Sequence, residues 1–397
     1  MKDFDDALHE ILSTIDGPLP GEQVALPDAL DRVLARDIHA RRTQPPLDVS
    51  AMDGYAVRAA DLPGTLRVTQ EIAAGQHDTA PLAVQEAARI FTGAPLPPGA
   101  DAIAIQENAE IVKGGVRFDN GLKPGRYVRA AGLDFKQGDL LVTAGQMVSP
   151  RNLAVIAGGN HPFVRVHRRP RVAVLATGDE IRAPGEPLGP AQIVSSNNLA
   201  LCAFIRAQGG EPVDFGTVGD TLQAVEATAA RLQGFDIVVT TGGASVGKHD
   251  LVAHGFGNQG LDLSFWKIAM RPGKPLIFGR FGTGLFLGLP GNPVSALVLA
   301  LLILRPMLRA FLGLSTDLPR SPAILSHAMP ANDQRRDFIR ARRLPDGRID
   351  ARARQDSSML TTLLGADVLI DRPAHGEPLS EGATVHVIDL RSLGASF

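Results

Sequence analysis

Short polar segments in the second half of the chain follow apolar runs that have the composition of buried strands. Thr177-Gly178-Asp179-Glu180 follows Val172–Ala176, and Gly219-Asp220 follows Val213–Thr217. In an open α/β sheet, ligands bind where loops leave the carboxyl ends of the strands. Glycine allows a sharp turn at such a point, and the two adjacent carboxylates, Asp179 and Glu180, suit a hard cation. A simpler alternative for Asp220 is that it caps the helix that follows.

A glycine-rich loop, Thr240 to Asp250, follows the apolar run Ile237–Val239. Gly242 and Gly243 leave backbone amides free to point at an anion, Ser245 can donate a hydrogen bond, and Asp250 can hold a cation or position a water. Gly242, Gly247 and Lys248 fit the phosphate loop of nucleotide triphosphatases, but His249 stands where that loop needs a Ser or Thr for magnesium. We therefore expect an anion-binding loop and not an ATPase of that class.

A further segment, Leu289-Pro290-Gly291-Asn292-Pro293, ends a strand and begins a helix. Asn292 stands at the cap position and Pro293 at the first helical position, so the free amides and the positive dipole end of the helix face the loop edge. An ordinary well-capped helix would explain this segment by itself. Because the glycine-rich loop belongs to the same sheet, we interpret Pro290, Gly291 and Asn292 as part of a phosphate pocket.

Three cations, Lys267, Arg271 and Lys274, lie within a short stretch beside the single tryptophan, Trp266. Proline and glycine fix the backbone there, which favours an anion-binding role over a solvated surface. Earlier in the chain, Ser50 to Val57 contains Asp53-Gly54, which alone is only a tight turn.

The elements that carry the polar segments alternate between strands and helices from Arg171 to about Leu314. The expected strands are Val172–Ala176, Val213–Thr217, Ile237–Thr241 and Leu285–Leu289, and the expected helices are Asn198–Ala207, Leu222–Leu232 and Pro293–Leu312. Strands that are apolar throughout and separated by amphipathic helices predict a mostly parallel sheet covered on both faces. We assign this three-layer α/β domain to residues 171–315.

The remaining residues divide into a helical layer and two β-rich regions. Apolar spacing predicts helices at 2–15 and Leu26–Ile38, and Ser149-Pro150 caps a third helix that ends at Gly158-Gly159. We assign 1–40 and 141–170 to this discontinuous helical domain, and 41–140 to a β-rich insertion. The expected strands of the insertion are Leu66–Ile72, Ala88–Thr92, Ala102–Ile105 and Val116–Phe118. Residues 316–397, with strands at Phe338–Arg342, Val368–Asp371 and Thr384–Ile388, predict a small barrel or sandwich.

Composition excludes several classes of protein. The chain has 397 residues, and 40 basic against 42 acidic side chains give a net charge of −2, so no positive field favours nucleic acid or an anionic membrane. The single cysteine, Cys202, allows neither an intramolecular disulfide nor a cysteine metal cluster. The acidic N-terminal residues do not fit a signal peptide, which predicts a cytoplasmic protein. The longest apolar stretch, Val294–Leu304, is too short to cross a bilayer and predicts a buried helix.

Taken together, the motifs closely resemble the MoeA and gephyrin E-domain family. The segments that carry the resemblance are Ser50–Val57, Thr92–Pro95, Thr177–Glu180, Thr241–Asp250, Arg271–Pro275 and Leu289–Ser295. The resemblance implies an elongated homodimer whose subunits have a helical dimerisation domain, an inserted β domain, a molybdopterin-binding-type α/β domain and a C-terminal β-barrel. It also implies a cleft between the α/β domain of one subunit and the Ser50–Tyr55 segment of its mate.

The reaction implied by the resemblance is insertion of molybdenum from molybdate into adenylylated molybdopterin, with Mg²⁺ present and AMP released. Asp53, Glu180, Asp220 and Asp250 would then serve in metal binding, water positioning and hydrolysis of the anhydride. Lys267, Arg271 and Lys274 would hold molybdate or phosphates, and Thr92 and Ser245 would donate hydrogen bonds. Gly242, Gly243, Pro290, Gly291 and Asn292 would complete the substrate pocket. The sequence departs from the family at Lys248, where an acidic residue is common, and at Arg271, where some members have lysine.

Two other functions stay open at this point. The molybdopterin adenylyltransferase shares the glycine-rich loop and the helix start, but it needs only an α/β domain; it is also a candidate partner that delivers the substrate. A non-catalytic pterin-binding or peptide-binding scaffold would not need the four acidic residues together. In the C-terminal region, Arg335, Arg336, Arg340, Arg342, Arg343, Ser357 and Ser358 either form a basic surface or reach the cleft. The sequence does not distinguish molybdate from tungstate.

Overall fold

The computed structural model describes residues 1–76, 78–243, 251–351, 354–391 and 393. It divides the chain into two compact units. The first contains Met1–Glu22 and His167–Phe397, and the second is Gln23–Val166. Each unit is described by itself below.

The first unit is built on a six-stranded sheet with the strand order β16-β13-β17-β21-β20-β18. The strands are β13 (Arg171–Thr177), β16 (Glu211–Val218), β17 (Ile237–Thr241), β18 (Leu261–Lys267), β20 (Pro275–Phe281) and β21 (Gly284–Leu289). Strands β16, β13, β17 and β21 pair in parallel. Strand β20 pairs antiparallel with both of its neighbours, β21 and β18. The predicted mostly parallel sheet is therefore confirmed. We predicted neither β20 nor β18. Strand β18 lies at the edge of the sheet, and its residues are only partly buried and lack a continuous apolar run.

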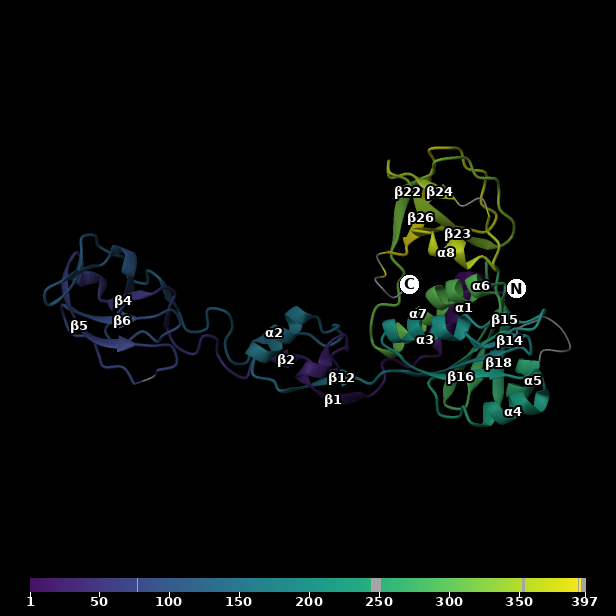
Figure 1. Cartoon of the computed structure of the whole chain (residues 1–397), viewed down its shortest axis with the longest axis horizontal. Coiled ribbons are helices and arrows are strands. Elements are labelled where there is room, and N and C mark those ends of the chain that lie inside the picture. Colours follow the sequence, from purple (N-terminus) through teal and green to yellow (C-terminus); the bar gives the residue numbers. More distant parts are fainter. Residues whose placement is uncertain (77, 244–250, 352–353, 392, 394–397) are drawn as a thin grey trace. The chain divides into compact units, whose positions relative to one another are not determined.

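Helices cover both faces of this sheet, as Figure 1 shows. One face packs against α1 (Phe4–Ser13), α3 (Asn197–Ala207) and α6 (Pro293–Leu299), and the other against α4 (Leu222–Ala230) and α5 (Leu251–Asn258). Val172 and Val174 of β13 belong to the first core, whereas Ala173 and Leu175 belong to the second. Successive strand side chains point to opposite faces, so a strand buried on both faces must be apolar throughout.

The longest helix spans Pro293–Phe311 and is 78% buried. It consists of α6, a π-helical turn at Ala300–Leu304 and α7 (Arg305–Phe311). Pro306 near the start of α7 has no backbone N–H, so the regular hydrogen-bond ladder has to be adjusted before it. The helix is long and apolar enough to cross a membrane by composition, but its burial is that of a core helix. The prediction of a buried helix at Val294–Leu304 is confirmed.

The C-terminal part of the first unit is a small barrel. Its strands are β22 (Arg320–Ile324), β23 (Arg336–Arg343), β24 (Ile349–Ala351), β25 (Val368–Arg372) and β26 (Thr384–Asp389). They pair antiparallel in the order β22-β26-β25-β23-β24. Leu325, just after β22, bridges to Ile349 in β24, and the N–H of Ser326 donates to the Ile349 carbonyl (2.9 Å). These contacts close the strands around a separate apolar core, which confirms the predicted barrel.

A two-residue strand, β19 (Met270–Arg271), connects the α/β region to this barrel, because it pairs in parallel with β23. The stretch that contains Arg271 therefore belongs to the C-terminal sheet and not to the loop edge of the α/β sheet. This position had no signal in the sequence, since two residues are too few to show a strand period.

The second unit contains a six-stranded sheet with the order β7-β4-β6-β5-β9-β8. The strands are β4 (Gly54–Val57), β5 (Gly64–Ile72), β6 (Glu86–Ile90), β7 (Ala102–Ile105), β8 (Glu110–Val112) and β9 (Gly115–Phe118). Apolar clusters lie on both of its faces. The four predicted strands are confirmed within two residues at their ends.

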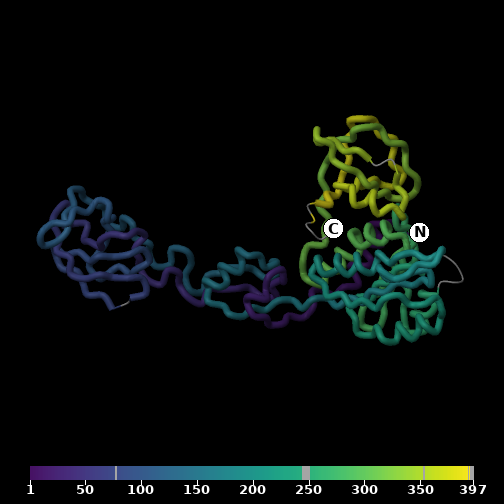
Figure 2. Tube along the Cα trace, viewed as in Figure 1, coloured from purple at the N-terminus to yellow at the C-terminus, as the bar shows by residue number. Residues whose placement is uncertain are grey.

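The rest of the second unit joins residues 23–40 to residues 141–166, which run side by side in Figure 2. Helix α2 (Pro150–Gly158) begins as predicted: the Ser149 side chain accepts from the N–H of Asn152, whose side chain accepts from the N–H of Ser149. The predicted helix at Leu26–Ile38 is wrong. Only a 3₁₀ turn forms at Leu26–Ala29, and Asp31 adopts a left-handed conformation with φ 59°. Val33 and Leu34 instead bridge to Met147 and Val166.

Candidate functional site

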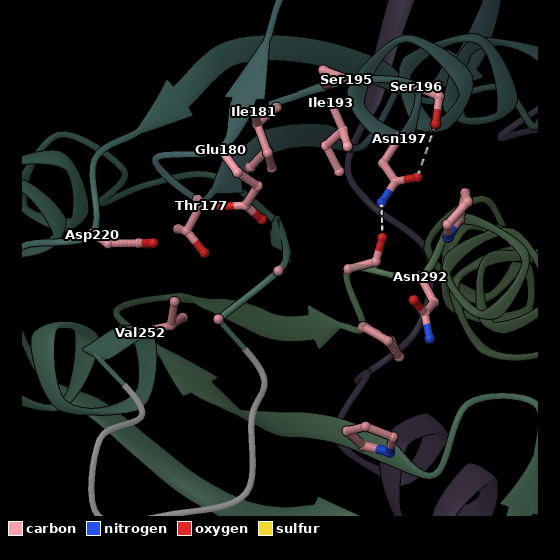
Figure 3. Close-up of a pocket in the computed structure, with 18 of the residues that line it drawn as sticks. Thr177, Glu180, Ile181, Ile193, Ser195, Ser196, Asn197, Asp220, Val252 and Asn292 are labelled. Carbon is pink, nitrogen blue, oxygen red and sulfur yellow. Dashed lines mark hydrogen bonds between the residues drawn. The ribbon is translucent and has the colours of Figure 1, made fainter. Parts of the chain in front are cut away.

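A cleft of about 830 Å³ lies at the carboxyl ends of β13, β17 and β21. These strands are parallel, so the loops that follow them meet at one edge of the sheet. Of the predicted site residues, Glu180, Asp220, Gly242, Gly243, Pro290, Gly291 and Asn292 line this cleft. Figure 3 shows Thr177, Glu180 and Asp220 on one side of the cleft and Asn197 and Asn292 on the other.

The acidic side of the cleft is held by two reciprocal hydrogen bonds between loops. The N–H of Asp220 donates to Asp179 Oδ1 (3.1 Å), and the N–H of Asp179 donates to Asp220 Oδ2 (3.3 Å). The cap of α4 is Thr221, whose hydroxyl accepts from the N–H of Ala224 (3.2 Å). The alternative that Asp220 caps this helix is therefore wrong. Asp179, which the sequence offered with Glu180 as one of two adjacent carboxylates for a cation, uses its side chain to position the Asp220 loop.

Glu180 lies close to the turn at Gly178, which has φ 147°. A Cβ atom at position 178 would approach Glu180 Oε2 to 2.6 Å. Glycine is therefore needed both for the backbone conformation and for the position of the carboxylate. Glu180 and Asp220 are exposed to the cleft, and neither forms an ion pair with any residue that the structure describes.

The floor of the cleft is formed by close contact between three loops. A Cβ atom at Gly243, which has φ 63°, would lie 2.7 Å from Thr177 Oγ1 and 2.4 Å from Val252 Cγ2. A Cβ atom at Gly291 would lie 3.5 Å from the Gly242 Cα. The loops after β13, β17 and β21 therefore pack against one another at glycines, and a side chain at Gly243 would occupy the space beside Thr177.

A network of amides and hydroxyls supports the opposite side. Asn197 Nδ2 donates to Thr241 Oγ1 (2.7 Å) and to the carbonyl of Gly291 (2.9 Å), and Thr241 Oγ1 donates to the carbonyl of Pro290 (3.2 Å). Asn197 thus ties the glycine-rich loop to the helix start. The sequence analysis missed it, because an asparagine at the beginning of a predicted helix has the usual signal of a cap.

Asn292 has the predicted cap position and Pro293 the predicted first helical position, but the Asn292 side chain forms no capping hydrogen bond. Its Nδ2 instead donates to Ser357 Oγ (2.8 Å), and the N–H of Val294 donates to the Ser357 carbonyl (3.1 Å). Ser358 lines the cleft. Ser357 therefore lies at the helix start and Ser358 in the cleft. Of the two alternatives stated from the sequence, a basic surface or reach to the cleft, the serines follow the second.

The three predicted cations do not line the cleft. Arg271 forms a bidentate ion pair with Asp337, with Nε–Oδ1 2.9 Å and Nη2–Oδ2 2.6 Å. Lys267 lines a separate hollow together with Met1 and Trp266. Lys274 directly precedes Pro275, which does line the cleft. The structure thus brings the backbone of this stretch to the cleft, but not the charges of Lys267 and Arg271.

The C-terminal arginines are mostly paired with nearby carboxylates. Their partners are Asp333 for Arg335, Asp371 and Asp5 for Arg336, Asp350 for Arg342, and Asp389 for Arg343. Arg340 is buried and donates to the carbonyl of Asp356 (3.0 Å) and to Gln355 Oε1 (3.2 Å). Arg340 therefore holds the loop that carries Ser357 and Ser358, and burial lowers the pKa of its guanidinium.

In the second unit, Asp53 and Thr92 form a local pair. Asp53 Oδ1 accepts from the Thr92 N–H (2.8 Å) and from the Thr92 hydroxyl (2.8 Å). These two hydrogen bonds lower the pKa of the Asp53 carboxyl. The turn is held by Arg89, whose Nη1 donates to the carbonyl of Gly54 (2.9 Å). Asp53 is therefore presented as an exposed carboxylate with a fixed orientation.

Asp250, Ser245 and Lys248 lie outside the described residues. Within the described ranges, no group of three His, Cys, Asp or Glu side chains could hold a metal ion. Mg²⁺ usually takes only one or two carboxylates, together with waters and substrate phosphates. Glu180 and Asp220 place two carboxylates, the donor type that Mg²⁺ takes, on one side of the cleft.

Family models match almost the whole chain. The MoeA N-terminal region (domain I and II) matches residues 2–159, a probable molybdopterin binding domain matches residues 173–310, and the MoeA C-terminal region (domain IV) matches residues 322–390.

Individual proteins match over similar lengths. A molybdopterin molybdenumtransferase of Nostoc sp. is 36% identical over 326 residues, covering 79% of this chain and 75% of the relative. Molybdopterin molybdenumtransferase 2 of Mycobacterium tuberculosis is 36% identical over 384 residues, covering 92% and 94%. The crystal structure of a molybdopterin biosynthesis MoeA protein from Pyrococcus horikosii matches with a TM-score of 0.85 at 33% identity, over 98% of each chain.

Proposed function

The chain belongs to the MoeA family of molybdopterin molybdenumtransferases, and we propose that its cleft transfers molybdenum from molybdate to adenylylated molybdopterin with release of AMP. It is a transferase of molybdenum cofactor biosynthesis. The family resemblance stated from the sequence is confirmed. The finer assignments below, to residues, metal and assembly, are proposals.

The main support for this proposal is that the two sides of the cleft have different chemical character. Glu180 and Asp220 supply negative charge on one side, while the positive dipole end of the helix that begins at Pro293 favours an anion on the other. Ile181, Ile193 and Val194 add an apolar wall, although Ile193 and Val194 are exposed. A substrate with a flat ring system and a phosphate anhydride has groups that suit all three surfaces.

Magnesium would be held by Glu180 and Asp220, with Asp250 as a predicted further ligand. When bound, the ion would offset the repulsion between molybdate and the anhydride and polarise the phosphoryl oxygens. The protein would hold the carboxylates in place through the two reciprocal hydrogen bonds between Asp179 and Asp220 and through the turn at Gly178. Because the substrate brings its own dithiolene sulfurs, the reaction needs no cysteine from the protein, and Cys202 is buried.

For the cationic residues, we propose that Lys274 contacts an oxyanion, because it adjoins the cleft residue Pro275. For Lys267 and Arg271 the same role rests on the family resemblance alone. Arg271 would have to exchange its bidentate partner Asp337 for the oxyanion. Arginine can do so with planar, bidentate geometry.

We further propose a homodimer in the cytoplasm, in which Asp53 of the partner subunit serves the cleft. Asp53→Ala and Glu180→Ala would then each inactivate the enzyme, because each lacks one half of every site. Co-expression of the two variants would restore activity, since mixed dimers contain one intact site. Sedimentation analysis gives the assembly state, and no restoration in proven mixed dimers would contradict the shared site.

The molybdopterin adenylyltransferase alternative is disfavoured by the extent of the match. The N-terminal and C-terminal MoeA regions match residues 2–159 and 322–390, which an α/β domain alone does not contain. A scaffold role would not explain why Glu180 and Asp220 face the cleft without an ion-pair partner among the described residues. The adenylyltransferase stays our proposed partner for substrate delivery.

The proposed function is tested by incubating purified protein with adenylylated molybdopterin, molybdate and Mg²⁺. AMP release is followed together with reconstitution of an apo molybdoenzyme. We expect AMP release that depends on molybdate and a product that reconstitutes the enzyme. ATP-dependent adenylylation of molybdopterin would instead support the adenylyltransferase, and binding without turnover would support a scaffold.

A further inference from the structure

The hydroxyl of Thr177 has no hydrogen-bond partner among the residues that the structure describes. Thr177 ends β13 and is only 3% exposed, yet it lines the cleft. Buried hydroxyls in native proteins nearly always have a partner, because leaving one unpaired costs its hydration. An unpaired hydroxyl that faces a substrate cleft therefore indicates a partner that arrives with the ligand.

The backbone of two glycines approaches this hydroxyl closely. A Cβ atom at Gly243 would lie 2.7 Å from Thr177 Oγ1, and one at Gly242 would lie 3.3 Å from it. Both glycines have positive φ, so the turn itself also disfavours a side chain. Because a side chain at either position would clash with Thr177, these glycines keep side-chain atoms away from the edge of the cleft that Thr177 lines.

The groups around this space favour an anion. The loop of Gly291 contacts Gly242, and directly after it begins the helix Pro293–Phe311, whose positive dipole end attracts negative charge. The hydroxyl of Thr241 accepts from Asn197 and donates to the Pro290 carbonyl, and it forms no hydrogen bond with Thr177. Figure 3 shows Thr177 close to Glu180, so an anion at Thr177 would also lie near the proposed metal ligands.

An unpaired buried hydroxyl is not by itself a site, as Thr240 shows. Its Oγ1 also lacks a partner among the described residues, and the residue is fully buried on β17. Thr240 does not line the cleft. The two threonines therefore differ in access to ligand and not in chemistry, which makes Thr240 a matched control.

We propose that Thr177 is a further substrate-binding residue, whose hydroxyl donates a hydrogen bond to an oxygen of a tetrahedral oxyanion. The oxyanion is either the phosphate of the AMP moiety or molybdate, which share charge and shape at the contacting oxygen. This inference rests on the proposed function and deepens it, because it names a residue that contacts the substrate in the same cleft.

The test compares Thr177→Val, Thr177→Ser and Thr240→Val in the full-length protein. Binding of AMP with Mg²⁺ and of molybdate is measured separately by calorimetry, and thermal unfolding is measured without ligand. Thr177→Val should weaken binding of one probe by about tenfold or more, because a hydrogen bond to a charged group is lost. Thr177→Ser should bind like the wild type, and Thr240→Val should bind both probes normally. The melting temperatures of both valine variants should be unchanged or higher, since each replaces an unpaired hydroxyl by a methyl group of the same shape.

The outcomes separate the possibilities. Weaker AMP binding identifies phosphate as the oxyanion, and weaker molybdate binding identifies molybdate. Equal affinities of Thr177→Val and wild type for both probes would overturn the inference while leaving the proposed function intact. A lower melting temperature of Thr177→Val alone would also overturn it, because the hydroxyl would then have a structural partner. If the wild type binds neither probe, the inference fails together with the proposed function.

Discussion

Carboxylates occur in two contrasting settings within the first unit. In the C-terminal barrel, Asp371 is buried and lies between Arg336 (2.7 Å) and Arg320 (2.6 Å). In the cleft, Glu180 and Asp220 face open space without a cation partner among the described residues. The first arrangement neutralises charge inside the protein and stabilises the fold. The second leaves charge available to a ligand, so the pairing of a carboxylate, and not its residue type, indicates its role.

The largest effect should come from removing one cleft charge. Asp220→Asn keeps the hydrogen bonds to Asp179 but lowers the charge at the proposed magnesium site. We expect kcat for AMP release to fall by about 10²- to 10³-fold, as for loss of one preorganised electrostatic group, with an unchanged melting temperature. Asp262→Asn, an equal change at an exposed position of β18, is the control and should keep full activity. Equal kcat in the two variants would mean that Asp220 does not act in the cleft.

The corresponding change in the barrel should affect stability and not turnover per folded molecule. Asp371→Asn leaves Arg336 and Arg320 without their shared partner, so we expect a loss of about 3 kcal/mol in the free energy of unfolding. Urea unfolding followed by circular dichroism measures it. If Asp371→Asn were as stable as the wild type but had a low kcat, Asp371 would act in turnover and not in stabilising the barrel.

The same contrast predicts how stability depends on pH. Burial alone would raise the pKa of Asp371, but hydrogen bonds and charge from Arg336 and then Arg320 outweigh it, so the pKa is lowered. A carboxyl with a lowered pKa stabilises the folded state above its unfolded pKa of about 3.9. This stabilisation should be lost as the pH falls through the folded-state value. Urea midpoints between pH 6 and pH 3 should drop more for the wild type than for Asp371→Asn, and parallel drops would be inconsistent with the network.

The smallest effect should come from the apolar wall of the cleft. Ile193→Ser removes an exposed apolar side chain that lines the cleft, whereas Leu188→Ser removes one that does not. Loss of about 1 to 1.5 kcal/mol of apolar contact should raise KM about five- to tenfold for Ile193→Ser without changing kcat. Leu188→Ser should leave both constants unchanged. A similar KM for the two variants would mean that the apolar wall does not contact the substrate.

Much of the fold follows from local patterns. The central strands β13, β17 and β21 were predictable because burial on both faces makes them apolar, and the Ser149 cap of α2 was predictable because its signal is local. The helix expected at Leu26–Ile38 failed because tertiary bridges from Val33 and Leu34, together with the left-handed residue Asp31, override the apolar spacing. The two-residue strand β19 had no detectable period.

The candidate site was predictable where strand ends carry it. Glu180, Asp220 and Asn292 each follow a recognisable strand, so topology alone brings them to one edge. Arg271 was expected to bind an oxyanion, but its side chain pairs with Asp337 outside the cleft. Asp337 is 66 residues away in the sequence, so no local signal shows that pair. Thr177 and Asn197 were overlooked because their importance depends on which hydrogen bonds they make or lack in three dimensions.

The central claim is that Glu180 and Asp220 in the cleft hold magnesium for molybdenum insertion. Its most direct test is the Mg²⁺ dependence of molybdate-dependent AMP release for the wild type and Glu180→Gln. We predict that the wild type requires Mg²⁺ and that Glu180→Gln needs a markedly higher Mg²⁺ concentration for its residual activity. The same Mg²⁺ dependence in both proteins, or full activity without Mg²⁺, would contradict the claim.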